Sequence, residues 1–174
     1  MKVAIYGQYY QNSTEPIIKD IFVFGCTTGL RFSDIFAITN KNFEKNNGEW
    51  YLKVKSIKTK TYTYIKLPGY AVAIYEKYKT KNDTKPIFGT KDLTNFNRSL
   101  KRIGEMAGFT DAVHSSREQL GKTIKKTSKK KNERFCDKMS SHMMRRTAIT
   151  TLLILGMPEH LVRKISGHSH ASTS

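Results

Sequence analysis

The sequence predicts an α+β fold that is mainly α-helical, with a small antiparallel β-sheet or hairpin in its first half. Apolar residues recur with helical spacing on both sides of residues 50–66, and within that stretch polar and apolar side chains alternate with period two. The chain has 174 residues, of which 38% are hydrophobic, so it can bury one core. We therefore expect a single domain over residues 1–174.

The first expected element is a buried helix within "TEPIIKDIFVFGCTTG". Thr14 can cap its N-terminus, Pro16 suits its first turn, and Gly29 is a typical residue at which a helix ends. A second, short helix follows in "LRFSDIFAIT", with Ser33 as the expected N-cap. Arg31 therefore lies in the tight connection between these two helices.

A β-hairpin is expected next. The letters "NNGE" indicate a turn, "WYLKVKS" alternates with period two, and "TYTYIKLP" is typical of the returning strand. The residues "IKTK" between the two strands form the expected tip. Lys58 and Lys60 therefore lie at an exposed end of the hairpin.

The rest of the chain is predicted to be largely helical, with helices over 68–78, 92–108, 142–155 and 158–166. Asp92 is a suitable N-cap for the second of them, and Gly108 a suitable end. Ser140 or Ser141 can cap the third, which ends at Gly156.

Charge limits the class of partner. Thirty-one Lys and Arg against fourteen Asp and Glu give a formal charge of +17, which destabilises a compact chain unless a polyanion offsets it. Nucleic acid is the leading candidate. Residues 121–135 carry seven Lys or Arg and one Glu, so they form either a solvated loop or a strap that neutralises DNA phosphates.

Cysteine usage and hydropathy bear on the compartment. Cys26 and Cys136 are far apart and form neither a disulfide framework nor a zinc site. The N-terminus lacks the apolar segment of a signal peptide, and no run approaches the roughly twenty apolar residues of a membrane span. We expect a bacterial cytoplasmic protein without a membrane partner.

Four short motifs follow one another in a fixed order: "TGLR" at 28–31, "KT" at 58–59, "HMMR" at 142–145 and "GH" at 167–168. His142 and Arg145 are three residues apart on one expected helix, so they project from the same side. This ordered set resembles the catalytic domain of tyrosine recombinases, the integrases of phages and conjugative transposons, from about Pro16 onward.

The resemblance implies the catalytic-domain fold of that family and a role in DNA integration or site-specific recombination. The family residues that match are Arg31, Lys58, His142, Arg145 and His168. It implies double-stranded DNA as substrate, no cofactor or metal, and a tetramer on DNA for the full-length enzyme, with this chain alone a monomer.

Two parts of the family pattern fall outside this sequence. The family has an N-terminal core-binding domain before the catalytic domain, and its nucleophilic tyrosine follows the motif of His168 at a short distance. None of the nine tyrosines lies between that histidine and Ser174. We therefore expect a catalytic domain that is inactive alone.

The chemistry suits the residue types. Attack on a DNA phosphodiester builds negative charge on the nonbridging oxygens, which two arginines can hold through forked, permanently charged donors. A lysine at a hairpin tip can protonate the departing 5′ oxygen, and histidines can donate hydrogen bonds or transfer protons near neutral pH.

Each residue also has a simpler interpretation. Arg31 can pair with Asp34 to brace the turn, Lys58 can be one solubilising lysine among many, and His168 can be favoured by a helix dipole.

A non-enzymatic alternative treats "TTLLILGMPEHLVRKISG" as a helix-turn-helix in which Arg163 and Lys164 face the DNA groove. A generic RNA-binding protein explains the charge but leaves the four ordered motifs as coincidence.

Overall fold

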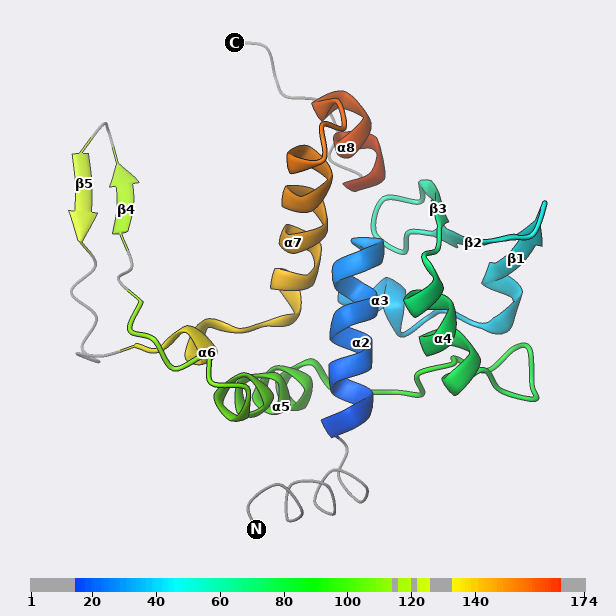
Figure 1. Cartoon of the computed structure of the whole chain (residues 1–174), viewed down its shortest axis with the longest axis horizontal. Helices are drawn as coiled ribbons and strands as arrows, with labels where there is room; N and C mark the ends of the chain where they lie inside the picture. Colours follow the sequence, from blue (N-terminus) through cyan, green and yellow to red (C-terminus); the bar gives the residue numbers. More distant parts are fainter. Residues whose placement is uncertain (1–14, 114–115, 120–121, 126–132, 167–174) are drawn as a thin grey trace.

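The computed structural model describes residues 15–113, 116–119, 122–125 and 133–166. Its elements, in chain order, are α2 (Glu15–Thr28), α3 (Phe32–Ile35), η1 (Asn40–Asn42), β1 (Phe43–Asn46), β2 (Glu49–Lys55), β3 (Tyr62–Lys66), α4 (Gly69–Tyr78), α5 (Leu93–Met106), β4 (Ser116–Gln119), β5 (Lys122–Lys125), α6 (Phe135–Lys138), α7 (Ser141–Ile154) and α8 (Glu159–Ser166) (Figure 1). The prediction of a mainly helical α+β fold is confirmed. Among the described residues, no helix is both long and apolar enough to cross a membrane.

Helices α2 and α7 lie side by side at the centre of the molecule (Figure 1). Gly25 makes this close approach possible, because a Cβ atom there would lie 2.5 Å from Met144 Sδ and 3.1 Å from Ile35 Cδ1. Helix α2 also contacts α4 and α5. Burial of its apolar side chains places α2 in the core, with Ile18, Ile21 and Phe24 at most 2% exposed.

The three-stranded antiparallel sheet has the order β1-β2-β3. Its inner face buries Leu52 and Val54, and Phe43 stacks on Tyr75 of α4 with ring centroids 3.8 Å apart. Strands β2 and β3 confirm the predicted hairpin. Strand β1 was not predicted, because among its four residues only Phe43 is buried and no apolar alternation marks it.

Among the described residues, the helix ends follow the expected residues with one exception, and the predicted cap Thr14 lies outside these residues. Gly29 has φ +66°, and the Asp92 side chain accepts a hydrogen bond from Asn95 N at 2.9 Å. Ser33 was expected to cap the short helix, but this prediction is wrong. Arg31 occupies the N-cap position of α3 and Ser33 lies inside the helix. The helix therefore starts one residue after the arginine.

Strands β4 and β5 form a separate antiparallel pair, here called the arm, which extends away from the helices (Figure 1). The sequence predicted either a solvated loop or a strap for DNA phosphates over residues 121–135. The loop is wrong for 122–125, which form strand β5, and the strap stays a prediction. Residues 121 and 126–132 lie outside the described part of the chain.

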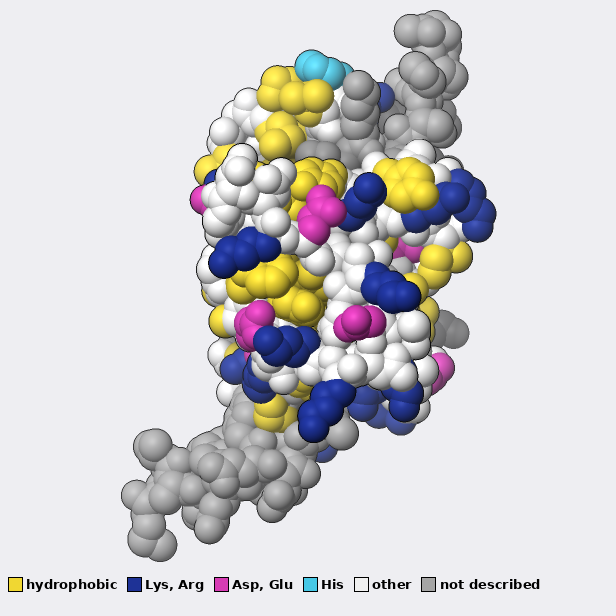
Figure 2. Space-filling model, turned by 90° about the vertical axis from the view of Figure 1, so that its right-hand side faces the viewer, with side chains coloured by type: hydrophobic (Ala, Val, Ile, Leu, Met, Phe, Trp, Pro, Cys, Tyr) yellow, Lys and Arg dark blue, Asp and Glu magenta, His cyan; other side chains and the backbone are white. Residues whose placement is uncertain are grey.

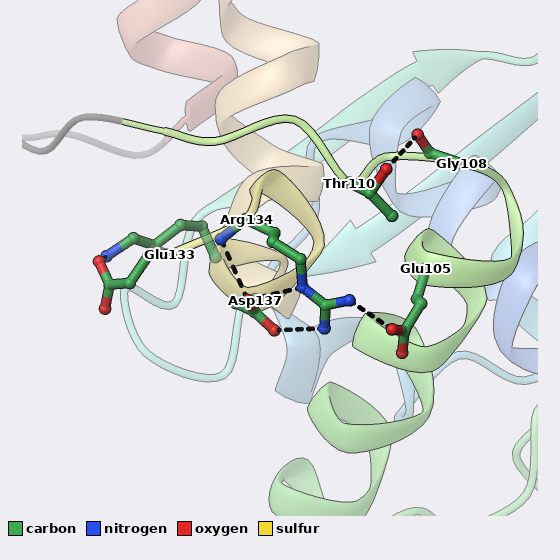
Figure 3. Close-up of polar contacts among 7 residues, drawn as sticks. Glu105, Gly108, Thr110, Glu133, Arg134 and Asp137 are labelled. Atoms are coloured by element: carbon green, nitrogen blue, oxygen red, sulfur yellow. Dashed lines mark hydrogen bonds and ion pairs between the residues drawn. The ribbon is translucent and has the colours of Figure 1, made fainter. Parts of the chain in front are cut away.

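The base of the arm is tied to the body by Arg134. Its backbone N and its guanidinium bond Asp137 at 3.1 to 3.3 Å, and its Nη1 also pairs with Glu105 of α5 (Figure 3). Val113 N donates to Glu133 O at 2.8 Å beside this contact.

Candidate active site between two arginines

Arg145 is the most buried cation of the candidate site. It lies in the second turn of α7 and is 7% exposed, facing α2. Its Nη1 donates to the carbonyl oxygen of Gly29 at 2.9 Å, and its buried Nη2 has no hydrogen-bond partner among the described residues. Burial lowers the pKa of Arg145, the nearby charge of Arg31 lowers it further, and Asp34 opposes both.

Arg31 brings a second guanidinium to the same place from the other end of the chain. It stands half-buried at the N-cap of α3, two residues after the glycine that Arg145 contacts. Its Nη1 donates to Ser56 Oγ at 3.1 Å. Its charge lowers the pKa of Arg145, so the two arginines of the "TGLR" and "HMMR" motifs lie near each other in the structure.

Asp34 is buried, 2% exposed, and its carboxylate binds the hairpin and not the Arg31 guanidinium. Its Oδ1 accepts a hydrogen bond from Ile57 N at 2.9 Å. Both residues belong to the described part of the chain, and no ion pair joins Asp34 to Arg31 there. The alternative in which the pair merely braces the turn is therefore not what the structure contains.

Lys58 lies in the turn of residues 57–59, and its side chain is exposed. The turn is closed by hydrogen bonds from Lys60 N to Ser56 O and from Ser56 N to Thr61 O, both at 2.9 Å. Lys60 has φ +58°, in the left-handed region. Because Ser56 also accepts from Arg31, the turn that carries Lys58 is anchored to the arginine pair.

His142 is exposed on the first turn of α7, one turn before Arg145. It lines an open cavity of about 720 Å³ together with Arg146, Lys138 and several hydroxyl side chains of α7. Neither Arg31 nor Arg145 lines that cavity. His168 lies outside the described residues.

Sequence reasoning missed two parts of this geometry. The carbonyl of Gly29 and the hydroxyl of Ser56 each accept a hydrogen bond from one of the two arginines. A backbone carbonyl carries no sequence signal, although Gly29 lies within the quoted "TGLR". Ser56 directly follows the strand, and a serine there is ordinary in a turn.

The helix-turn-helix alternative receives no support from α8. The Arg163 guanidinium bonds Glu159 Oε1 at 2.6 and 3.0 Å, so its donors are engaged within the helix.

Among the described residues, no three His, Cys, Asp or Glu side chains gather closely enough to hold a metal ion. Metal independence itself stays a prediction.

Comparison with known protein families matches residues 5–174 to the phage integrase family. Among solved structures, the chain is similar to the XerH site-specific recombinase bound to difH substrate in a pre-cleavage complex, with TM-score 0.54 and 18% identity, covering 91% of this chain and 42% of that one. It is also similar to the Tn1549 transposon integrase in complex with circular intermediate DNA, with TM-score 0.52 and 16% identity, covering 95% and 54%. These likenesses show the fold.

Another match covers only a short part of the chain and comes from a protein with a different activity. A stretch of 59 residues is 49% identical to part of an NAD kinase from Flavobacterium johnsoniae and covers 34% of this chain but 18% of that protein. Such a short share shows neither the fold nor the activity of that kinase here. The chain also spans about half, or less, of the two solved recombinases it resembles.

Proposed function

Because this chain belongs to the phage integrase family, we propose that it is the catalytic domain of a tyrosine recombinase that integrates or recombines double-stranded DNA in the bacterial cytoplasm. The observation that carries the proposal is the pair of guanidiniums. Arg145 keeps a buried nitrogen without a partner among the described residues, and Arg31 lies close enough for its charge to lower the pKa of Arg145.

Two guanidiniums close together, one of them buried, are energetically unfavourable unless a ligand compensates their charge. A buried donor without a partner costs about 1–3 kcal/mol, and two like charges add repulsion. A phosphate diester placed against both guanidiniums would satisfy the free nitrogen and offset both charges through charge-assisted hydrogen bonds. The free nitrogen and the paired charges therefore support an anion as the ligand of this site.

The proposed reaction follows from where charge develops. A tyrosine oxygen attacks phosphorus, the bond to the 5′ oxygen breaks, and a 3′-phosphotyrosyl link forms. Arg31 and Arg145 stabilise the nonbridging oxygens, and Lys58 gives the departing 5′ oxygen its proton. A 5′ hydroxyl then reverses the step, so the bond energy is conserved and no nucleotide is consumed.

The remaining roles are family expectations. His142 and His168 are proposed to donate hydrogen bonds or move protons at the same phosphate. None of the nine tyrosines in this sequence is assigned as the nucleophile. The enzyme is proposed to act as a tetramer on two DNA sites. The 174-residue chain alone is proposed to be a monomer, and light scattering would measure this.

The test incubates the protein encoded by the complete gene with a DNA substrate that carries a trapped nick. The expected result is a covalent protein–DNA adduct that disappears when the tyrosine that forms it, identified by mass spectrometry, is replaced by Phe.

Two variants separate the proposal from the helix-turn-helix alternative. Arg145→Ala should abolish the adduct and Arg163→Ala should leave it. An adduct that survives Arg145→Ala, or DNA binding that depends on Arg163 alone, would reject the proposed site.

A further inference from the structure

The outer face of the β2–β3 hairpin carries lysines and tyrosines in alternation. The register pairs Lys53 with Tyr64 and Lys55 with Tyr62 across the two strands. These side chains lie on the side opposite the buried Leu52. We call Lys53, Lys55, Tyr62 and Tyr64 the outer face.

The aromatic rings of this face are open to solvent. Tyr62 is 67% exposed and Tyr64 is 50% exposed, so burial in the core does not explain them. Lys55 Nζ lies 5.4 Å and Lys53 Nζ 6.0 Å from the centre of the Tyr62 ring. The ring therefore holds two ammonium groups beside each other through cation–π attraction.

Charge on the hairpin is uneven. At its far end Lys66 pairs with Glu49 at 3.2 Å, and the pKa of Tyr64 is raised, mainly by a hydrogen bond to Glu44. Toward the tip, neither Lys53 nor Lys55 makes an ion pair within the described part of the chain. The uncompensated charge thus increases toward the turn that carries Lys58.

From this arrangement we propose that the outer face is a second DNA-backbone contact, separate from the arginine pair. The inference rests on the proposed function, because it takes the same duplex as its ligand. Lys53 and Lys55 would bind phosphates beside those approached by the Lys58 turn, with Tyr62 keeping both ammonium groups in place.

The hairpin with the outer face lies on a side of the molecule that carries charges of both signs (Figure 2). Figure 2, which faces the right-hand side of Figure 1, shows Lys and Arg side chains next to exposed hydrophobic ones on this side of the molecule. Two neighbouring lysines repel each other, and the ring contacts attract both ammonium groups without neutralising their charge. A polyanion offsets the rest, and phosphate groups on a duplex supply it at regular spacing.

The test measures how DNA affinity of the 174-residue chain depends on salt. A fluorescent duplex of arbitrary sequence is titrated by anisotropy at several NaCl concentrations, with Lys53→Gln/Lys55→Gln as the test variant. Lys81→Gln/Lys85→Gln is the matched control, because both lysines are exposed in the loop after α4 and removing them costs the same net charge.

Loss of two phosphate contacts should reduce the slope of log K against log[salt] by about 1.8, since each contact contributes about 0.9. The control should keep the parental slope, and Lys53→Arg/Lys55→Arg should restore it. Circular dichroism melts confirm that all variants stay folded.

Equal slopes for the test and control variants would overturn the inference and leave the proposed function intact. An acidic protein segment would then be the better ligand for the outer face. Failure of the parental chain to bind duplex DNA at all would overturn both.

Discussion

Arg31 donates a hydrogen bond from Nη1 to Ser56 Oγ at 3.1 Å, and this contact joins the first arginine of the site to the hairpin that carries Lys58. Asp34 makes a second link when its Oδ1 accepts from Ile57 N. The short helix α3 and the hairpin turn are therefore fixed to each other at two points. A phosphate held by the arginines would have the proposed proton donor on an element already anchored beside it.

Replacing Arg145 by Lys should remove the anion site while keeping a positive charge, because an ammonium group cannot reproduce the forked donor geometry. In the protein encoded by the complete gene, adduct formation should fall by about 10²–10³-fold.

The 174-residue chain gives an independent readout of the same change. Inorganic phosphate should raise its Tm, and Arg145→Lys should eliminate that rise. Arg146→Lys is the control, because Arg146 is exposed on the same helix. An unchanged phosphate response in Arg145→Lys would remove this arginine from the site.

Replacing Lys58 by Ala should slow adduct formation with ordinary DNA, since the 5′ oxygen then leaves without a proton. A substrate whose bridging 5′ oxygen is replaced by sulfur should restore the rate, because a thiolate leaves without protonation. Lys60→Ala is the matched variant from the same hairpin tip. If the sulfur substrate rescues Lys60→Ala instead, the assignment of the proton donor moves to Lys60.

Gly25→Ala should destabilise the protein although alanine favours helices. The better helix propensity contributes about 1 kcal/mol, whereas the new Cβ would lie 2.5 Å from Met144 Sδ and overpacking costs about 1–3 kcal/mol.

Urea unfolding measures the change in free energy, and Gly69→Ala serves as the control because a Cβ atom at Gly69 would meet nothing within 4 Å. In a Met144→Ala background, the cost of Gly25→Ala should shrink. Simple additivity of the two substitutions would show that the helices do not meet there.

Cys26 should react slowly with iodoacetamide, because burial raises the pKa of its thiol to about 11 and a hydrogen bond with Thr147 only partly opposes this. At pH 8 about one thiol in a thousand is then the reactive thiolate.

Mass spectrometry of a Cys136→Ser protein should find a rate that rises about tenfold per pH unit between pH 8 and 10. Thr147→Val should slow it further. Rapid labelling at pH 7 would mean that the α2–α7 contact opens.

Arg134→Met should loosen the base of the arm. The pKa of Asp137 lies below its ordinary value of 3.8, mainly because of its hydrogen bond with the Arg134 side chain, so the variant should bring it back up. A carboxyl with a lowered pKa stabilises the fold above pH 3.8, and this contribution is lost as the pH falls further. The stability difference between parent and variant, from urea unfolding, should therefore be full at pH 7 and shrink toward pH 3.

Much of the fold could be predicted because its helices carry strong local signals. Asp92, Gly29 and Gly156 mark helix ends by backbone and capping chemistry that does not depend on the rest of the fold. Strand β1 and the arm could not be predicted, because few apolar residues mark them and their pairing is decided by partner strands.

The candidate site also has a part that the sequence could predict and a part that it could not. Motif order identified Arg31 and Arg145, but their nearness arises only when α2 and α7 pack together. The acceptors at Gly29 and Ser56 depend on that packing too. His168 remains a sequence prediction, because it lies outside the residues described.

The contact between Arg145 and Gly29 spans 116 residues of sequence, which affects the order of events during synthesis. Translation delivers α2, α3 and the hairpin first, and domains generally fold as units once their chain is available. While α7 is still in the ribosome, Arg31 has no second guanidinium beside it. A nascent polypeptide can thus form the proposed phosphate pocket only after α7 has left the ribosome.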